Sequence, residues 1–520
     1  MEVIEVKNYK GHIRNWKDLC NELDIDLNLT RKEREKQIIT KGYTKWKEDI
    51  GNHLYGSFSF VIETEDYIFG IRDQFGTIPF YYYLTEDNEL LHGTKIKDFI
   101  NHPKFNKELN KDMLQIYLSL TYVAGENTFF KGVKKLMPGK YLIYKNKELS
   151  INTYWEPTFD PDNSKTIEEY ADEIHSTMQT IMQEIKDENE TAESFLSGGV
   201  DSSYVLAMSD ITTANTCGYE EKQYDESPLA KKTADYFYKR LNKALITPEE
   251  YFSIVPSVMK NMEQPLADAS AIVFALSCRK VSLHTRLCYS GEGVDELFAG
   301  YNAYKNAYKY RNKLKNTYIG NTNIMNEEEK KLLLKEYNPD IKPIDLATNI
   351  YNKMTNYSPL SKMQNIDIQL WLEGDIYLNV AKMSEINNLE VRMPLTDIRI
   401  FNIASKLPDE YKINSKQNKI AFRLCASKVL PEEIAYRKKL GFVVPIRYWL
   451  ADSKYNENII KMITSPLSEK FFNYDEIEKL MLDYLQGNND LWRIIWTIYT
   501  FLVWYKEYFP EDKACLDERI

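Results

Sequence analysis

A glycine-rich turn in the middle of the chain, SGGVDSS at residues 197–203, constrains the fold more than any other segment. It follows the apolar pair Phe195–Leu196 and opens a run with helical spacing, so it predicts a strand, a tight turn and a helix. Further strands are predicted at 214–219 and 286–290, with a helix at 227–242 between them. Strands that alternate with helices indicate a doubly wound parallel α/β sheet, in which ligands bind at the carboxyl ends of the strands.

The N-terminal third differs, because its apolar residues come in short β-rich runs. Gly, Asp and Pro separate these runs, which lie at residues 54–64, 67–71, 79–84 and 136–155. They predict a strand-rich α+β domain over residues 1–155. The polar, proline-bearing segment 156–165 is interpreted as a linker, and residues 165–520 as the second domain.

Composition excludes several classes of protein. The 520 residues carry a formal net charge of −10 without a sustained Lys/Arg tract, which argues against binding to nucleic acid or an anionic membrane. The six cysteines and six histidines show neither C-x-x-C nor H-x-x-H spacing, so a disulfide framework and a zinc site are not expected. The longest apolar stretch, between Arg493 and Lys506, is too short to cross a bilayer and predicts a buried helix. No secretory signal is visible, and we expect a cytoplasmic protein.

The turn at 197–203 suits a phosphate ligand. Its glycines allow close approach of the backbone, and the helix that follows offers unpaired N–H groups. Serine hydroxyls add donors, and Asp201 could hold a magnesium ion that bridges phosphate oxygens. The alternative is an Asp/Ser helix cap after a tight turn.

A second glycine-rich turn, SGEGVDELFAGY at residues 290–301, again follows a predicted strand. Glu292, Asp295 and Glu296 would repel one another without a cation or a charged substrate nearby. Asp295 is predicted as a second magnesium ligand that faces Asp201, and Glu292, between two glycines, as a residue that acts on the substrate. The alternative is an acidic first turn of a helix.

Two further segments carry charge. In LEVRMPLTD (389–397), Glu390 and Arg392 alternate with apolar residues, which places them on one face of a strand-like segment. In YRKKLGFVVPIRYWL (436–450), two lysines precede Gly441, and basic side chains on a glycine-bearing loop suit an anionic transition state. The alternative for each segment is a surface ion pair.

These four motifs, in this order, resemble the synthetase domain of asparagine synthetases and their relatives, and the resemblance spans nearly all of residues 165–510. It implies a sheet of the pyrophosphate-loop adenine nucleotide hydrolase type. It also implies an AMP-forming carbon–nitrogen ligase that uses ATP and Mg²⁺. Such a ligase adenylates a carboxylate and releases pyrophosphate, after which an amine attacks and AMP leaves.

The resemblance also assigns roles to residues. Asp201 and Asp295 would hold magnesium, and Lys439 would steady the activated intermediate and the departing pyrophosphate. Glu292 stands where asparagine synthetases carry Glu and β-lactam synthetases carry Tyr, which favours an intermolecular amide. The β,γ-phosphates would lie on Ser197, Gly198, Gly199, Asp201, Ser202 and Ser203, and the adenosine along Leu196, Cys217, Ser290 and Gly291.

Departures from the family pattern limit what is carried over. Ala381 stands where the family usually carries Asp, and Glu385 and Asn387 differ as well, near the expected acyl-acceptor region. These differences argue against assigning aspartate as the substrate.

The N-terminal domain resembles the family's glutaminase domain, an N-terminal-nucleophile fold, at residues 55–63, 69–83 and 137–144. That domain needs a cysteine as its first residue, whereas Glu2 follows Met1 here and the first cysteine is Cys20. The glutamine-binding Asn-Gly-Glu aligns with residues 10–12 (Lys-Gly-His), and the Ser-Asp-Thr-Glu with residues 29–32 (Leu-Thr-Arg-Lys). We therefore expect a truncated, degenerate glutaminase-like domain that does not hydrolyse glutamine.

Three functions are considered for a chain with these motifs. The first is a ligase that joins a small-molecule or peptide carboxylate to ammonia or a separate amine, supplied in solution or by a partner protein. The second is an intramolecular cyclase of the β-lactam synthetase or lasso-peptide type, whose members also lack the nucleophilic cysteine. The third is a catalytically silent nucleotide-binding regulator, which predicts the loss of a charged site residue, and none is lost. A family-like homodimer is compatible with each of them.

Overall fold

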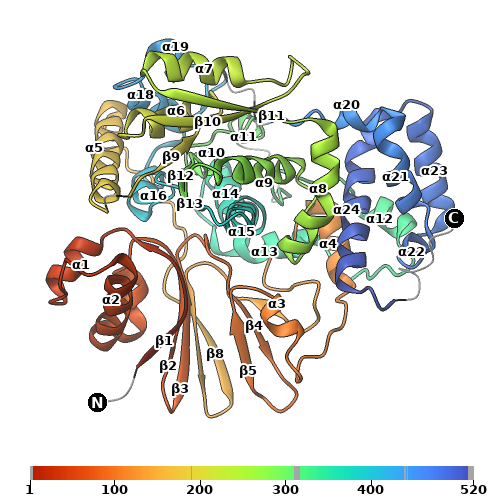
Figure 1. Cartoon of the computed structure of the whole chain (residues 1–520), viewed down its shortest axis with the longest axis horizontal. Helices are drawn as coiled ribbons and strands as arrows, with labels where there is room; N and C mark the ends of the chain where they lie inside the picture. Colours follow the sequence, from red (N-terminus) through yellow and green to blue (C-terminus); the bar gives the residue numbers. More distant parts are fainter. Residues whose placement is uncertain (1–3, 189, 310–316, 439–440, 442, 513–520) are drawn as a thin grey trace.

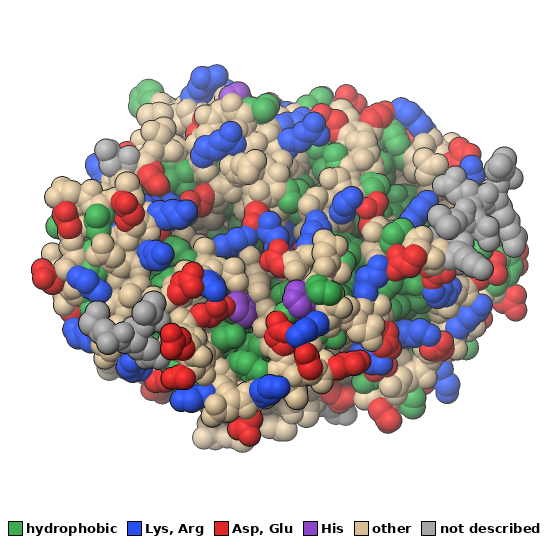
Figure 2. Space-filling model, turned by 60° about the horizontal axis from the view of Figure 1, so that its bottom comes forward, with side chains coloured by type: hydrophobic (Ala, Val, Ile, Leu, Met, Phe, Trp, Pro, Cys, Tyr) green, Lys and Arg blue, Asp and Glu red, His purple; other side chains and the backbone are tan. Residues whose placement is uncertain are grey.

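The computed structural model describes residues 4–188, 190–309, 317–438, 441 and 443–512. In Figure 1 the N-terminal domain, in red to orange, lies below a parallel sheet, and the C-terminal helices, in blue, lie beside both. None of the helices in the described ranges combines the length and the apolarity that crossing a membrane requires. Basic and acidic side chains are interspersed over the face shown in Figure 2.

The N-terminal domain is built on an antiparallel sheet with strand order β1-β2-β3-β7-β8. In β2, Phe58, Phe60 and Ile62 point to one face of this sheet, where they pack with helices α1 (Trp16–Glu22) and α2 (Arg31–Trp46), while Val61 points to the other face. A second sheet has the order β5-β4-β6. The strands are β1 (Glu5–Ile13), β2 (Gly56–Glu63), β3 (Tyr67–Arg72), β4 (Tyr81–Leu84), β5 (Leu90–Gly93), β6 (Lys134–Lys135), β7 (Lys140–Lys145) and β8 (Glu148–Thr153).

The second domain contains a five-stranded sheet in which every neighbouring pair is parallel, with the order β11-β10-β9-β12-β13. The strands are β9 (Glu193–Phe195), β10 (Thr213–Gly218), β11 (Arg240–Leu245), β12 (Leu287–Tyr289) and β13 (Glu390–Arg392). The chain leaves β9 toward β10 and β11, and returns on the other side of β9 as β12. The turns after β9 and β12 therefore lie at a topological switch point, where parallel sheets open a crevice for ligands.

Helices cover both faces of this sheet. On one face, α5 (Ile167–Lys186) and α6 (Val200–Ala207) pack on Leu196, Ala214 and Tyr289. On the other face, α9 (Ala269–Val281) places Cys278 and Val281 against Cys288. The sheet is thus doubly wound, as the alternation of strands and helices predicts.

One predicted boundary is wrong. The helix expected over residues 227–242 ends as α7 (Ser227–Tyr236), and the chain then reverses through Tyr238, whose φ is 53°, into the edge strand β11. This strand pairs only with β10, and most of its residues remain partly exposed. An edge strand without a buried face lacks the apolar alternation by which strands are recognised.

The C-terminal part is helical. Its central helix, α24 (Trp492–Tyr508), is the buried helix predicted from the apolar stretch that ends at Lys506, and it packs against α8 (Pro248–Met262) and α4 (Asp112–Leu120). Nearer the parallel sheet, a π-helical segment η2 (Asp367–Tyr377) continues directly into α15 (Leu378–Ile386). This long continuous element borders the crevice at the switch point.

Candidate active site

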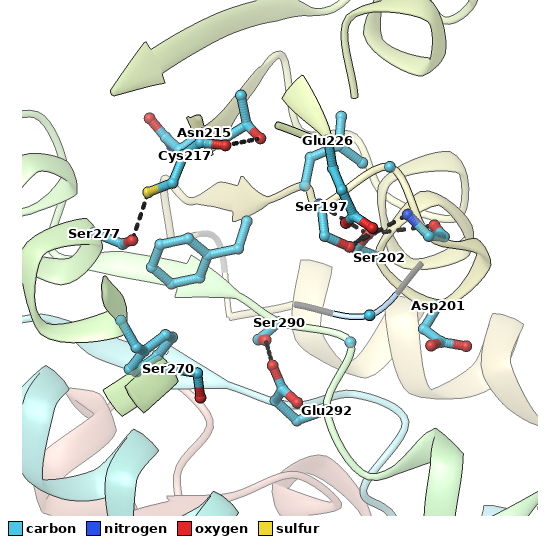
Figure 3. A pocket seen from close by; sticks show the side chains of 18 of the residues that line it. Ser197, Asp201, Ser202, Asn215, Cys217, Glu226, Ser270, Ser277, Ser290 and Glu292 are labelled. Carbon is cyan, nitrogen blue, oxygen red and sulfur yellow. Dashed lines mark hydrogen bonds between the residues drawn. The ribbon is translucent and has the colours of Figure 1, made fainter. Parts of the chain in front are cut away.

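A cavity of about 850 Å³ lies at the carboxyl ends of β9, β10 and β12. The turns after β9 and β12 both face it, and Figure 3 shows their side chains around one hollow. Among the described residues, its lining includes all those predicted for the nucleotide, the metal and the chemistry except Ser203: Leu196, Ser197, Gly198, Gly199, Asp201, Ser202, Cys217, Ser290, Gly291, Glu292 and Asp295.

The turn after β9 is shaped by its own side chains. Gly198 has a φ of 87°, and a Cβ there would lie 2.8 Å from the Cβ of Leu229, so only glycine fits. The amide of Ser197 donates to Oγ of Ser202 at 3.2 Å, and the amide of Gly199 donates to Oγ of Ser197 at 3.3 Å. These contacts hold the backbone around the first turn of α6, where N–H groups suit an anion.

Ser203, the predicted residue of the described chain that does not line the cavity, is fully buried behind the turn. Its hydroxyl donates to the carbonyl oxygen of Gly199 at 2.7 Å. This serine therefore supports the turn from behind. Lys439, which is predicted for the same site, lies outside the described residues.

Asp201 and Asp295, the two predicted magnesium ligands, meet at one lysine. The Nζ atom of Lys419 lies 2.7 Å from Oδ2 of Asp201 and 2.8 Å from Oδ1 of Asp295. The Lys419 side chain is only 2% exposed, and burial opposes its charge, yet the two carboxylates together raise its pKa above the usual value. Lys419 remains charged as a result, and the two strands' turns are joined through it.

A magnesium ion fits this arrangement in one respect. Two carboxylates already converge on a cation, and Mg²⁺ in nucleotide sites typically takes one or two carboxylates together with phosphate oxygens and water. No cluster of three or more His, Cys, Asp or Glu ligands occurs in the part of the chain that the structure describes. An ion held by Asp201 and Asp295 would need further ligands from a nucleotide.

Glu292 sits on the turn after β12, and two hydroxyl groups hold its backbone. Thr396 donates from Oγ1 to the carbonyl oxygen of Glu292 at 3.1 Å and pairs with the hydroxyl of Tyr377 at 2.9 Å. At the next residue, Gly293, a Cβ would lie 2.6 Å from that tyrosine oxygen. The side chain is held as well, because Oγ of Ser290 donates to Oε1 of Glu292 at 3.3 Å, as Figure 3 shows.

The described part of the 437–445 loop borders the phosphate-binding turn. Arg437 donates from Nη1 to the carbonyl oxygen of Gly198 at 2.5 Å, and Lys438, Gly441 and Val443 line the cavity. Residues 439, 440 and 442 lie outside the described ranges. The basic loop predicted from the sequence therefore faces the same turn that is expected to hold phosphate.

Comparison with known proteins identifies the family of this chain. The family described as asparagine synthase matches residues 183–506. The chain belongs to the asparagine synthase family. A glutamine amidotransferase domain matches residues 5–155, so this family member joins an N-terminal amidotransferase-type domain to the asparagine synthase domain.

The relatives bear the same family name. The chain is 30% identical to asparagine synthetase [glutamine-hydrolyzing] 1 of Bacillus subtilis (strain 168), over 97% of this chain and 86% of that protein. It is 24% identical to asparagine synthetase [glutamine-hydrolyzing] 3 of the same strain, over 83% of this chain and 74% of that protein. A solved glutamine phosphoribosylpyrophosphate amidotransferase from B. subtilis overlaps 46% of this chain and 45% of its own, at 14% identity and a TM-score of 0.21, which is too low to indicate a shared fold. The family membership makes this protein a homologue of carbon–nitrogen ligases.

In the asparagine synthase domain, Glu390 and Arg392 form a largely buried ion-pair network, not a surface pair. Nη1 and Nη2 of Arg31, from the N-terminal domain, lie 2.9 Å and 3.0 Å from the two carboxylate oxygens of Glu390. Arg392, whose side chain is fully buried, contacts Glu390 at 2.6 Å and Glu188 at 2.6 Å. Burial opposes the charge of Arg392, but these carboxylates raise its pKa overall.

Further ion pairs across the same boundary between the two domains involve Asp397, Glu385 and Glu373. Arg14 contacts Asp397 at 2.6 Å, with both side chains fully buried. Lys10 pairs with Glu385. Glu373, on η2, is held by Arg72 at 2.9 Å and by Lys135 at 2.6 Å. The domains are therefore joined by charge through their interior, and Lys10 and Arg31 come from the segments that are predicted to align with glutamine-binding motifs.

Sequence reasoning missed several residues of this site. Lys419 lies in a polar run, SKQNK, that gives no sign of burial beyond the apolar residues after it. Tyr377 and Thr396 act through hydroxyl groups that only the tertiary structure brings to Glu292. Asn379 also lines the cavity and stands outside every motif.

Proposed function

We propose that this family member activates a carboxylate as an acyl adenylate and joins it to ammonia or to a separate amine, without hydrolysing glutamine itself. The observation that carries the proposal is the convergence of Asp201 and Asp295 on Lys419, inside the cavity that also holds Glu292. Two carboxylates and an ammonium, beside a glycine-rich turn at a helix N-terminus, match the needs of a nucleoside triphosphate with its counter-ions.

The chain's own residues would manage the charge of the reaction. A carboxylate that attacks the α-phosphate must approach a polyanion, so the N–H groups of the 197–203 turn and the ammonium of Lys419 would neutralise the phosphates. Magnesium held by Asp201 and Asp295 would supply further neutralisation when bound. Lys439 keeps its expected role in steadying the departing pyrophosphate.

Glu292 is proposed as the residue that acts on the nitrogen of the incoming ammonia or amine. Its carboxylate is fixed beside the second turn by Ser290 and Thr396, within the same cavity as the phosphate-binding turn. A carboxylate next to an acyl adenylate could remove the proton from an incoming ammonium or amine. Glutamate at this position also favours a separate amine over ring closure within one substrate.

Two internal segments of the N-terminal domain support the absence of glutamine hydrolysis. Lys10 and Arg31 stand in the segments that align with the family's glutamine-binding motifs, and both are engaged by carboxylates of the asparagine synthase domain. His12 is buried, and burial together with nearby arginines lowers its pKa well below the usual value, so it stays neutral. These residues serve the contact between domains and offer no carboxylate for a glutamine amine.

The test combines ATP and Mg²⁺ with a panel of carboxylic acids and either ammonia or glutamine, and measures pyrophosphate and glutamate. We expect AMP and pyrophosphate with ammonia and at least one acid, and no glutamate from glutamine. Asp201→Asn and Asp295→Asn should each abolish pyrophosphate release. Failure of every acid to yield pyrophosphate, although ATP binds, would refute the ligase, and release of glutamate would refute the ammonia route.

A further inference from the structure

One part of the cavity wall carries uncharged side chains from α9, η2 and α15, whereas Lys280, near the end of α9, lines the cavity as well. Ser270 and Phe274 come from α9, Ile376 from η2, and Asn379 and Val380 from α15. We call these five residues the neutral wall. In Figure 3, Ser270 lies on the same side of the hollow as Ser290 and Glu292. The body of the acid whose carboxyl group reaches the phosphates would therefore contact the neutral wall.

Five of the described lysine and arginine side chains in the cavity lining have partners of their own. Lys243 pairs with Asp225 at 2.9 Å, and Lys280 pairs with Glu250 at 3.0 Å. Arg423 donates to the carbonyl oxygen of Ala435 at 2.7 Å. Lys419 and Arg437 hold the phosphate side, and Lys438 follows Arg437 on that same side. None of these groups stands ready to receive a carboxylate at the neutral wall.

The residues behind the wall add no counter-ion. Lys382, two positions after Val380, is 2% exposed and pairs with Glu263, away from the cavity. Asp268 accepts from the amide of Ser270 at 2.9 Å and from its hydroxyl. Burial raises the pKa of Asp375 well above its usual range, and this side chain is not part of the cavity lining. A free amino group would therefore find no ready carboxylate from these residues.

Asn379 offers a hydrogen-bonding group on a surface that is otherwise mostly apolar. The residue lines the cavity, is 6% exposed, and has an amide oxygen that is buried without a hydrogen-bond partner among the described residues. A buried polar atom left without a partner is costly, so such atoms are usually satisfied by a ligand or by water. Phe274, Ile376 and Val380 surround the same space with apolar surface.

We infer that the acid is a carboxylate carried on an uncharged, amide-bearing body, such as the side-chain carboxyl of a residue within a peptide, and that Asn379 reads one of its amide donors. A free amino acid would have to bury a second carboxylate against the neutral wall, and an unpaired buried charge is strongly disfavoured. The inference rests on the proposed function for the reaction, but the binding preference itself depends only on the wall.

The experiment compares two ligands with the same reactive carboxyl group: L-aspartate, and N-acetyl-L-aspartic acid α-methylamide, in which both α-groups are capped as amides. Binding to the full chain is measured by calorimetry with Mg²⁺ and α,β-methylene-ATP. We expect the capped acid to bind at least about ten-fold more tightly than aspartate, since one tenfold step corresponds to about 1.4 kcal/mol. Equal or tighter binding of aspartate, or no binding of either ligand, overturns the inference.

A pair of variants tests the role of Asn379. Asn379→Leu, of similar size but without the amide, should weaken binding of the capped acid about ten-fold and leave the affinity for ATP unchanged. The control is Asn402→Leu, on the exposed face of helix α16 (Ile398–Ala404), which should change neither. If Asn379→Leu binds the capped acid as well as the wild type does, Asn379 is not the specificity residue.

The two proposals fail in different ways. Pyrophosphate release with aspartate and none with the capped acid would leave the ligase in place and remove the inference about its substrate. Selective binding of the capped acid without pyrophosphate release from ATP would remove the ligase and leave the binding preference of the neutral wall.

Discussion

Lys419 is the residue on which the two carboxylates of the cavity converge, and its removal should affect the chemical step. In Lys419→Met the cation between Asp201 and Asp295 is lost, so the phosphates lose a fixed positive charge. We expect kcat for pyrophosphate release to fall by about 100-fold or more, as for other preorganised charges. The control, Lys416→Met, changes an exposed lysine three positions earlier and should keep full activity. An unchanged kcat in Lys419→Met would exclude this role.

Asp367 is a buried carboxyl whose titration should appear in the stability of the protein. Burial raises its pKa to about 7, although hydroxyl groups of Tyr304 and Tyr318 donate to it. The folded protein therefore keeps a proton that the unfolded chain releases near pH 4. Between about pH 4 and pH 7 this residue makes folding less favourable as the pH rises, by at most about 1.4 kcal/mol per pH unit.

Asp367→Asn should remove that part of the pH dependence. Urea unfolding at pH 4, 5, 6 and 7 would show the variant gaining stability relative to the wild type as the pH rises. Asp66→Asn, an exposed aspartate in the turn between β2 and β3, is the control and should give a flat difference. A flat difference for Asp367→Asn would mean that this carboxyl is already ionised in the folded protein.

At the scale of elements, the turn after β12 depends on its neighbours. Tyr377, at the end of η2, supports Thr396, and Thr396 donates to the carbonyl of Glu292. In Tyr377→Phe one hydroxyl contact worth about 1 kcal/mol is lost, which corresponds to roughly a five-fold change. We expect kcat to fall by about that factor with an unchanged KM for ATP, in steady-state assays of pyrophosphate release. A rise in the KM for ATP instead would place Tyr377 with the nucleotide.

The segment that follows β13 is held from the other domain by Arg14. Arg14→Met removes one of the two arginines that contact the fully buried carboxylate of Asp397, and Arg399 remains at 2.9 Å. The cost should therefore be about 3 kcal/mol, the lower end of what breaking a buried pair typically costs. We expect a loss of that size in the free energy of unfolding, measured with urea. Lys45→Met removes an exposed pair with Glu22 and should cost less than about 1 kcal/mol. Similar losses in both variants would show that the Arg14 pair is not held in the interior.

The strands of the parallel sheet and the motifs that follow them could be predicted, because each strand is an apolar run with a turn directly after it. The turns at 197–203 and 290–301 were placed correctly beside one another, since neighbouring parallel strands end at the same edge. Lys419 and β11 could not be predicted in this way. Lys419 is buried only because two distant carboxylates receive it, and β11 is an edge strand without an apolar face. Both depend on tertiary contacts that leave no local pattern.

At the scale of the whole molecule, the two domains should remain together without a covalent link. The linker is itself tied down, because the amide of Asp162 donates to the carbonyl of Lys406 at 2.8 Å. Cleavage at a protease site inserted between the exposed residues Asn163 and Ser164 should give two fragments that co-elute in size-exclusion chromatography at physiological salt. Uncleaved protein is the control, and elution of two separate domains would contradict a tight interface.

Glu373 has its counter-ions on Arg72 and Lys135, and Asp397 has Arg14 in addition to its neighbour Arg399, so three of these four cations belong to the other half of the chain. Deleting that half would leave Glu373 without either of these cations and Asp397 with Arg399 alone. Under the proposed function, natural selection could let the glutamine-handling motifs drift while still preserving the domain that carried them. The former catalytic domain would thus be retained because it supplies positive charge to its neighbour. A deletion within this domain would destabilise the folded protein.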